Sequence, residues 1–146
     1  MLNNLNALAA DIHQANKDKG FWNTYYTLQE TPPAERPAYQ EDVVNALRVR
    51  CLALAAGELS EGIEAIRKGR NANPVDLEVV QQKVDAGEEW KTFFGIKVKD
   101  TEEDEIADAI IRLLDYAGAR GIDLEKHIEL KLAYNSSRPY LHGKTF

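Results

Sequence analysis

Two acidic pairs with the same spacing are the residues of this chain best suited to do chemistry. Glu58 and Glu61 lie in ALAAGELSEGIEAIRKG, and Glu105 and Asp108 lie in EEDEIADAIIRLLDYAG. Both segments have the apolar periodicity of a helix, and residues three apart on a helix share one face. Carboxylates gathered on one face can bind a divalent cation, which prefers oxygen ligands. The spacing therefore predicts a metal site.

Glu58 supports this prediction most strongly, because a helical wheel places it inside an apolar arc. The arc consists of Val44, Leu47, Cys51, Leu54, Ala55, Leu59, Ile63 and Ile66. Glu61 falls at the edge of the arc and Glu64 well outside it. A carboxylate directed into a core is unfavourable in its charged form unless a cation or a donor compensates it. A divalent metal is the economical compensation.

The alternative interpretation is that these carboxylates are solvated. Glutamate is a good helix former, and most helical glutamates face water. Taken alone, Glu105 and Asp108 fit a solvated face, because they only border the apolar arc of their helix. Considered with Glu58, and with Glu102 one turn earlier, they predict a shared metal site.

The length and charge of the chain limit its fold and its partners. A chain of 146 residues has the usual size of one domain, and we expect a single domain over residues 1–146. The net charge is −6, whereas a protein that binds a nucleic-acid polymer needs clustered Lys and Arg. The composition therefore argues against a nucleic-acid partner.

The sequence indicates neither a targeting signal nor a reactive cysteine. The first twenty residues lack the basic region and the continuous apolar run of a signal peptide, and no run approaches the length of a membrane span. We therefore expect a soluble, cytoplasmic protein with no membrane partner. Cys51 lies in the apolar arc of its helix, which favours a buried, inert thiol over a nucleophile.

The pattern of apolar residues predicts an all-α fold. Expected helices cover residues 2–17, 39–68, 74–86, 101–119 and 123–134, and expected irregular segments cover residues 20–39 and 135–146. The segment 87–99 is ambiguous between loop and strand, and we expect a loop. No segment alternates with a period of two. We expect the two acidic helices to pack antiparallel in a bundle. Because their apolar arcs are broad, a homodimer or homotetramer would complete the helical layer; a monomer with extra covering helices is the alternative.

Two other motifs suggested by the sequence lack residues that their usual functions require. The run from His142 to Thr145 ends like a phosphate-binding loop, but Arg138 stands where that motif needs glycine, and the sequence ends at Phe146. Di-iron bundles normally use Glu-x-x-His, and none of the three histidines has a glutamate three residues before it. No Ser or Cys partner for a histidine is suggested either.

The blocks GELSEGIEAIRKG, DEIADAIIRLLDYAGARGIDL and KLAYNSSRPYLHGK, preceded by IHQANKDKGFWN, resemble the MazG-like branch of the all-α nucleoside triphosphate pyrophosphohydrolases. The similarity covers residues 12–146 in scattered blocks. Its most specific element is the order of ExxE followed by ExxD on successive core helices.

The resemblance implies an activity and a set of metal ligands. Hydrolysis of a (deoxy)nucleoside triphosphate between the α and β phosphates would yield a monophosphate and pyrophosphate, as in nucleotide-pool housecleaning. Mg²⁺, with Mn²⁺ as a substitute, would be held by Glu58, Glu61, Glu105 and Asp108. Glu61, at the edge of the arc, is favoured as the base that deprotonates the attacking water.

The resemblance also implies substrate contacts at the C-terminus. Lys131, Asn135 and Arg138 form K-x-x-x-N-x-x-R and would face the nucleotide; a cationic surface at a helix C-terminus is the alternative. Trp22 would stack on the base, with packing under a loop as its alternative. The segment 73–99 between the acidic pairs departs from the family in length and aromatic content, which leaves base choice open.

Two other functions share part of this pattern. Phosphoribosyl-ATP pyrophosphohydrolase, from the same superfamily, uses similar acidic pairs. A non-catalytic helical module for dimerisation or regulation would retain the fold alone. Intact acidic pairs argue against this second alternative, because an idle buried Glu58 would be a liability.

Overall fold

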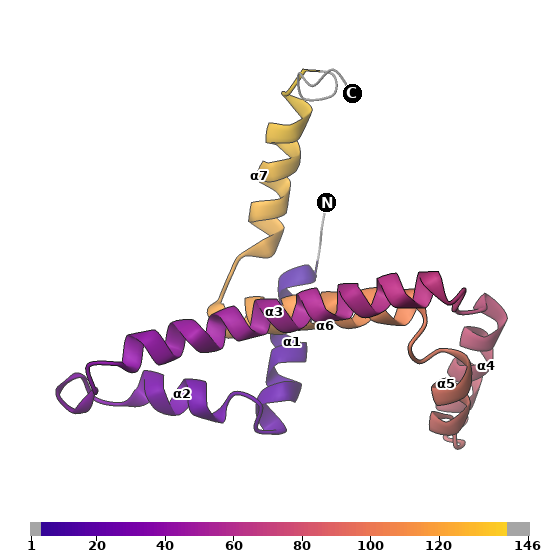
Figure 1. Cartoon of the computed structure of the whole chain (residues 1–146), viewed down its shortest axis with the longest axis horizontal. Coiled ribbons are helices and arrows are strands. Elements are labelled where there is room, and N and C mark those ends of the chain that lie inside the picture. Colours follow the sequence, from indigo (N-terminus) through magenta and orange to yellow (C-terminus); the bar gives the residue numbers. More distant parts are fainter. Residues whose placement is uncertain (1–3, 140–146) are drawn as a thin grey trace. The chain divides into compact units, whose positions relative to one another are not determined.

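The computed structural model describes residues 4–139, and within that range all regular secondary structure is helical. Its elements are α1 (Leu5–Asp18), α2 (Asn23–Glu30), a short 3-10 helix η1 (Pro33–Glu35), α3 (Gln40–Arg67), α4 (Pro74–Asp85), α5 (Lys91–Lys97), α6 (Glu102–Arg120) and α7 (Leu124–Ser136) (Figure 1). The predicted all-α class is confirmed. In the described part, no helix is both long and apolar enough to cross a membrane.

Two compact units make up the chain. One consists of residues 32–113, and the other combines residues 1–31 with residues 114–146. Helix α6 contributes its first two thirds to the first unit and its last residues to the second. The candidate metal ligands all belong to the first unit.

In the first unit, α3 and the beginning of α6 lie side by side and run antiparallel (Figure 1). Glu58 on α3 contacts Arg112 on α6, and Gly62, one turn later on α3, faces Glu105, which precedes Arg112. A Cβ at Gly62 would lie 3.4 Å from the Glu105 Cβ. The helices approach this closely because α3 presents a stripe of small buried residues at the contact, Ala55, Gly62 and Ala65.

The larger apolar residues of both helices remain outside this contact. On α3, Leu59, Ile63 and Ile66 are each more than half exposed within the chain. On α6, the exposed apolar side chains are Ile106, Ile110, Ile111 and Leu113. The predicted arc is thus broader than the surface that a single partner helix covers. Self-association of the chain remains a prediction that this apolar surface favours.

A helix stands where the sequence predicted a loop at residues 87–99. Helix α5 spans Lys91–Lys97 and contacts α4 (Figure 1). The backbone N–H of Thr92 donates to Glu89 Oε1 at 2.9 Å, which caps the first turn. Trp90 and Phe94, four residues apart, pack edge to face with ring centroids 6.0 Å apart. The loop prediction was wrong because these local contacts outweigh the β-prone composition of the segment.

A second helix, α2, lies within the aromatic segment 20–39 that was expected to be irregular. Trp22, Tyr25 and Tyr26 form a chain of edge-on ring contacts with centroids 5.3 and 5.4 Å apart. Tyr25 is the buried residue of α2, and the ring of Tyr26 packs edge to face on it. The chain leaves the helix only at Thr31, before Pro32 and Pro33.

In the second unit, α1 approaches the end of α6 very closely. A Cβ at Gly118 would lie 2.7 Å from the Cβ of His13 and closer still to the carbonyl oxygen of Ala9. Glycine is therefore required at this point for packing, although α6 continues through it. The close approach brings the polar side chains of α1 against Asp115, one turn before Gly118.

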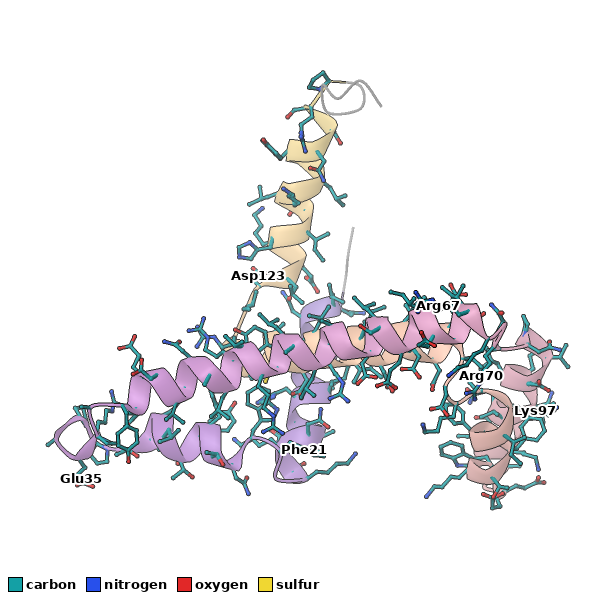
Figure 2. All side chains as sticks on the ribbon, in the orientation of Figure 1. Phe21, Glu35, Arg67, Arg70, Lys97 and Asp123 are labelled. Atoms are coloured by element: carbon teal, nitrogen blue, oxygen red, sulfur yellow. The ribbon has the colours of Figure 1, made fainter. Side chains whose placement is uncertain are left out.

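Helix α7 begins where the sequence predicted. Asp123 accepts a hydrogen bond from the Lys126 backbone N–H at 3.0 Å, as an N-cap does. Asn6 on α1 donates to Asp123 at 2.8 Å, and its backbone N–H donates to Glu125 at 3.0 Å. Figure 2 labels Asp123 at this junction. The helix extends to Ser136, two residues beyond the prediction, whereas His142, Gly143 and Phe146 lie outside the described residues.

Candidate metal centre

Three of the four predicted ligands converge in the first unit. One oxygen from each of Glu58, Glu105 and Asp108 lies within 4.8 Å of the other two. Glu58 comes from the contact face of α3, and the other two lie one turn apart on α6. Glu58 and Glu105 are buried, at 8% and 4% exposure, while Asp108 opens to solvent. The arrangement is a half-buried group of carboxylates with one accessible side.

Three charged carboxylates this close together are unfavourable unless a cation compensates them. Burial raises the pKa of Glu105, and the neighbouring carboxylates of Glu61 and Glu58 raise it further. Burial also raises the pKa of Asp108, with additional effects of Asp104 and Glu58 in the same direction. Carboxylates with raised pKa values in a shared site are stabilised in their charged form by a bound cation. Three oxygen donors with an open side fit Mg²⁺, which keeps positions for water and phosphate.

Arg112 supplies a positive charge to the cluster from within the chain. It lies one turn after Asp108 on α6, and its Nε donates to Glu58 Oε1 in a direct ion pair. The guanidinium and the Lys99 amine both lower the pKa of Asp108, against the raising effects of burial, Asp104 and Glu58. The sequence placed Arg112 near the acidic pair but did not reveal that it reaches the other helix.

Glu61 does not belong to the group of three, but it lies beside it. It is exposed and lines a hollow of about 470 Å³ together with Glu105, Glu64, Lys68 and Arg70. Its charge raises the pKa of Glu105, so the two carboxylates are close enough to interact. Glu61 thus faces open space next to the buried ligands. Its roles as ligand and as base remain predictions.

The hollow is held in shape by the segment that follows α3. The backbone N–H of Glu102 donates to the Arg70 carbonyl at 3.1 Å, and the N–H of Ala72 donates to Glu103 at 2.8 Å. Arg70 also lies 3.7 Å from Asp100, across the start of α6. Figure 2 labels Arg70 just beyond the end of α3. These contacts fix the position of Arg70, which lines the hollow together with Lys68 and the candidate ligand Glu105.

The predicted substrate contacts at the C-terminus belong to the second unit. Lys131 Nζ lies 5.2 Å from the centre of the Tyr134 ring, and the Arg138 guanidinium lies 6.0 Å from it. Asn135 is half-buried on the same helix. The two cations therefore gather over one exposed aromatic ring. Contact with a nucleotide remains a prediction.

Trp22 is buried within a hydrogen-bonded network in the second unit. Only 5% of it is exposed, and its indole N–H donates to Asp115 at 2.9 Å. Its ring packs edge to face on His13 at 5.0 Å between centroids. This geometry fits the packing alternative for Trp22. Stacking on a base remains a prediction.

Asp115 is the centre of this network, which sequence reasoning did not identify. It accepts hydrogen bonds from Asn16 at 2.8 Å and from Trp22, and it pairs with His13 Nδ1 at 2.8 Å. The other ring nitrogen of His13 lies 2.7 Å from the Tyr26 hydroxyl. Burial raises the pKa of that phenol. Asp115 follows Asp108 by seven residues and so lies near the same face of α6, but this spacing alone does not distinguish it from a solvated carboxylate.

Comparisons of the chain with protein families, curated proteins and solved structures find no match. The function of the chain is therefore inferred from its residues and their geometry, together with its resemblance to the MazG-like branch.

Proposed function

We propose that the chain is a Mg²⁺-dependent pyrophosphohydrolase of (deoxy)nucleoside triphosphates, as the resemblance to the MazG-like branch implies. The observation that carries this proposal is the convergence of Glu58, Glu105 and Asp108 within 4.8 Å from two antiparallel helices. The convergence supports the proposal because these three residues belong to the two acidic pairs that spacing and the family resemblance together predicted to share a cation. The products would be a nucleoside monophosphate and pyrophosphate.

In this proposal, the three clustered carboxylates bind the cation and the carboxylate of Glu61 accepts a proton. Glu58, Glu105 and Asp108 would hold Mg²⁺ on the open side of the cluster. When bound, the cation neutralises the triphosphate and the charge that develops on the leaving pyrophosphate. Glu61 lines the adjoining hollow, where it would accept the proton of the attacking water as the bond between the α and β phosphates breaks.

Paired substitutions on α3 test the metal role. Removing groups that merely support metal ligands costs about 10- to 100-fold in affinity or activity. Loss of a ligand in Glu58→Gln should therefore lower Mg²⁺-dependent turnover by about 100-fold or more. Glu41→Gln is the matched control, because Glu41 is exposed near the start of α3 and does not line the hollow. Equal turnover of the two variants would remove the support for a metal site at Glu58.

A non-catalytic helical dimerisation module is the second candidate. The exposed apolar stripe of α3, with Leu59, Ile63 and Ile66, favours self-association whether or not the chain is an enzyme. The two candidates differ in their response to Mg²⁺. If the chain is an enzyme, Mg²⁺ should raise the melting temperature of the wild type but not that of Glu58→Gln. If it is a dimerisation module, Mg²⁺ should raise neither melting temperature.

Phosphoribosyl-ATP is the alternative substrate within the enzymatic proposal. It carries the same triphosphate and would use the same carboxylates. A direct competition assay, in which phosphoribosyl-ATP and a nucleoside triphosphate are offered together, separates the two by the ratio of their kcat/KM values.

A further inference from the structure

Arg112 contacts the carboxylate cluster directly, yet the proposed chemistry gives it no role. Its Nε donates to Glu58 Oε1 across the contact between α6 and α3. The two side chains differ in their access to water, since 42% of the Arg112 side chain is exposed and only 10% of that of Glu58. A guanidinium therefore reaches from the solvent side over a buried carboxylate.

Because their exposures differ, breaking the ion pair costs Glu58 and Arg112 different amounts of free energy. Glu58 without a cation would be a buried, uncompensated charge, which is costly. Arg112 would return to water at little cost, because nearly half of its side chain is already exposed. The ion pair therefore breaks readily when another cation compensates the charge of Glu58.

A divalent ion bound to Glu58, Glu105 and Asp108 would be such a cation. It would carry twice the charge of a guanidinium and would repel Arg112 at a distance of a few ångströms. It would also compete for the carboxylate of Glu58, because Oε1, one of its two oxygens, already accepts the Arg112 bond. A metal bound through Oε1 would displace Arg112, and a metal bound through the other oxygen would repel it.

We propose that Arg112 is a built-in counter-ion that competes with the divalent metal for Glu58. This inference rests on the metal site of the proposed function. Arg112 holds the cluster together when the metal is absent, and it moves toward solvent when the metal binds. It is a positioning residue that sets the metal affinity of the site.

The test is direct measurement of Mn²⁺ binding to Arg112→Gln by the electron paramagnetic resonance signal of the free ion. The measurement is made at about pH 8, well above the ordinary carboxyl range. Removing the competitor should lower the dissociation constant about tenfold, which equals ~1.4 kcal/mol and lies near the lower end for a hydrogen bond between charged groups. The metal-free variant should also melt at a lower temperature than the wild type.

Arg67→Gln is the matched control, because Arg67 forms an ion pair with Glu64 on the surface of α3 (Figure 2). It should bind Mn²⁺ like the wild type. Arg112→Lys is a milder variant in case Arg112→Gln does not fold. A lysine amine is a point charge that cannot match the planar guanidinium. The Mn²⁺ dissociation constant of Arg112→Lys should therefore lie between those of the wild type and Arg112→Gln.

The outcomes separate this inference from the proposed function. If the wild type binds Mn²⁺ and Arg112→Gln binds it equally or more weakly, Arg112 is not a competitor and the inference is overturned. A wild type that binds no Mn²⁺ would instead refute the metal site itself. Tighter binding in both Arg112 variants, with no change in Arg67→Gln, supports the inference.

Discussion

Replacement of Gly118 by alanine tests the close packing of α1 against α6 in the second unit. The added Cβ would lie 2.7 Å from the Cβ of His13, about 0.7 Å inside the ordinary contact range that begins at 3.4 Å. It would also meet the Ala9 carbonyl, which belongs to the helix backbone and cannot rotate away. Overpacking of this kind costs about 1–3 kcal/mol and occasionally more, and the backbone contact places this site at the upper end.

Part of this cost is offset, because alanine favours a helix interior over glycine by about 1 kcal/mol. We therefore expect Gly118→Ala to lose about 2 kcal/mol of unfolding free energy, or roughly 6 °C in Tm for a chain of this size. Gly57→Ala is the matched control, since the described chain has no atom within 4 Å of a Cβ there. It should gain about 1 kcal/mol.

Thermal and urea melts of both variants measure the difference. A Gly118→Ala protein as stable as Gly57→Ala would refute the reasoning, because it would mean that α1 does not lie against α6 at this point. Loss of stability in both variants would instead show that α3 is also closely packed at Gly57.

Three further predictions concern charge, assembly and substrate binding. The pKa of Glu105 is raised above its ordinary 4.5 by burial, so the stability that its protonated form contributes is complete below that value and is lost as pH rises through the raised pKa. Because burial also raises the pKa of Asp108, metal-free melts should show a smaller loss in Glu105→Gln than in the wild type, and equal losses would contradict this role of Glu105. Ile63 is 52% exposed on α3, so Ile63→Glu should shift a dimer or tetramer toward monomer in light-scattering mass while leaving the circular dichroism helix signal unchanged. Arg138→Gln should raise the KM for a nucleoside triphosphate with little change in kcat, and an unchanged KM would remove Arg138 from the substrate site.

The helices were predictable where local signals agreed. Asp123 caps α7 and Pro74 begins α4, as their residue types require. Helices α2 and α5 were missed because their segments contain aromatic and β-branched residues next to prolines or glycines. Ring contacts four residues apart, such as Trp90 with Phe94, stabilise α5, and a count of propensities does not include them.

The candidate site was predictable in its ligand types and only partly in its geometry. Spacing identified Glu58, Glu105 and Asp108, because each pair shares one helix face. Which carboxylates meet depends on the close contact at Gly62, which is a property of two packed helices. Arg112 was not predictable as the partner of Glu58, because the two residues are 54 positions apart.

The second unit illustrates the same limit. Asp115 receives bonds from residues 93 to 102 positions away in the chain. Nothing in the local sequence of α6 distinguishes its carboxylate from a solvated one. The network depends on the close approach of α1, which Gly118 permits.

The most direct test of the proposed function is the identity of the first product. The protein is incubated with Mg²⁺ and a panel of ribo- and deoxynucleoside triphosphates, and pyrophosphate is resolved from orthophosphate over time. The proposal predicts equal amounts of monophosphate and pyrophosphate from at least one substrate, with none formed when Mg²⁺ is chelated. Orthophosphate as the sole primary product, or no turnover across the panel, would contradict it.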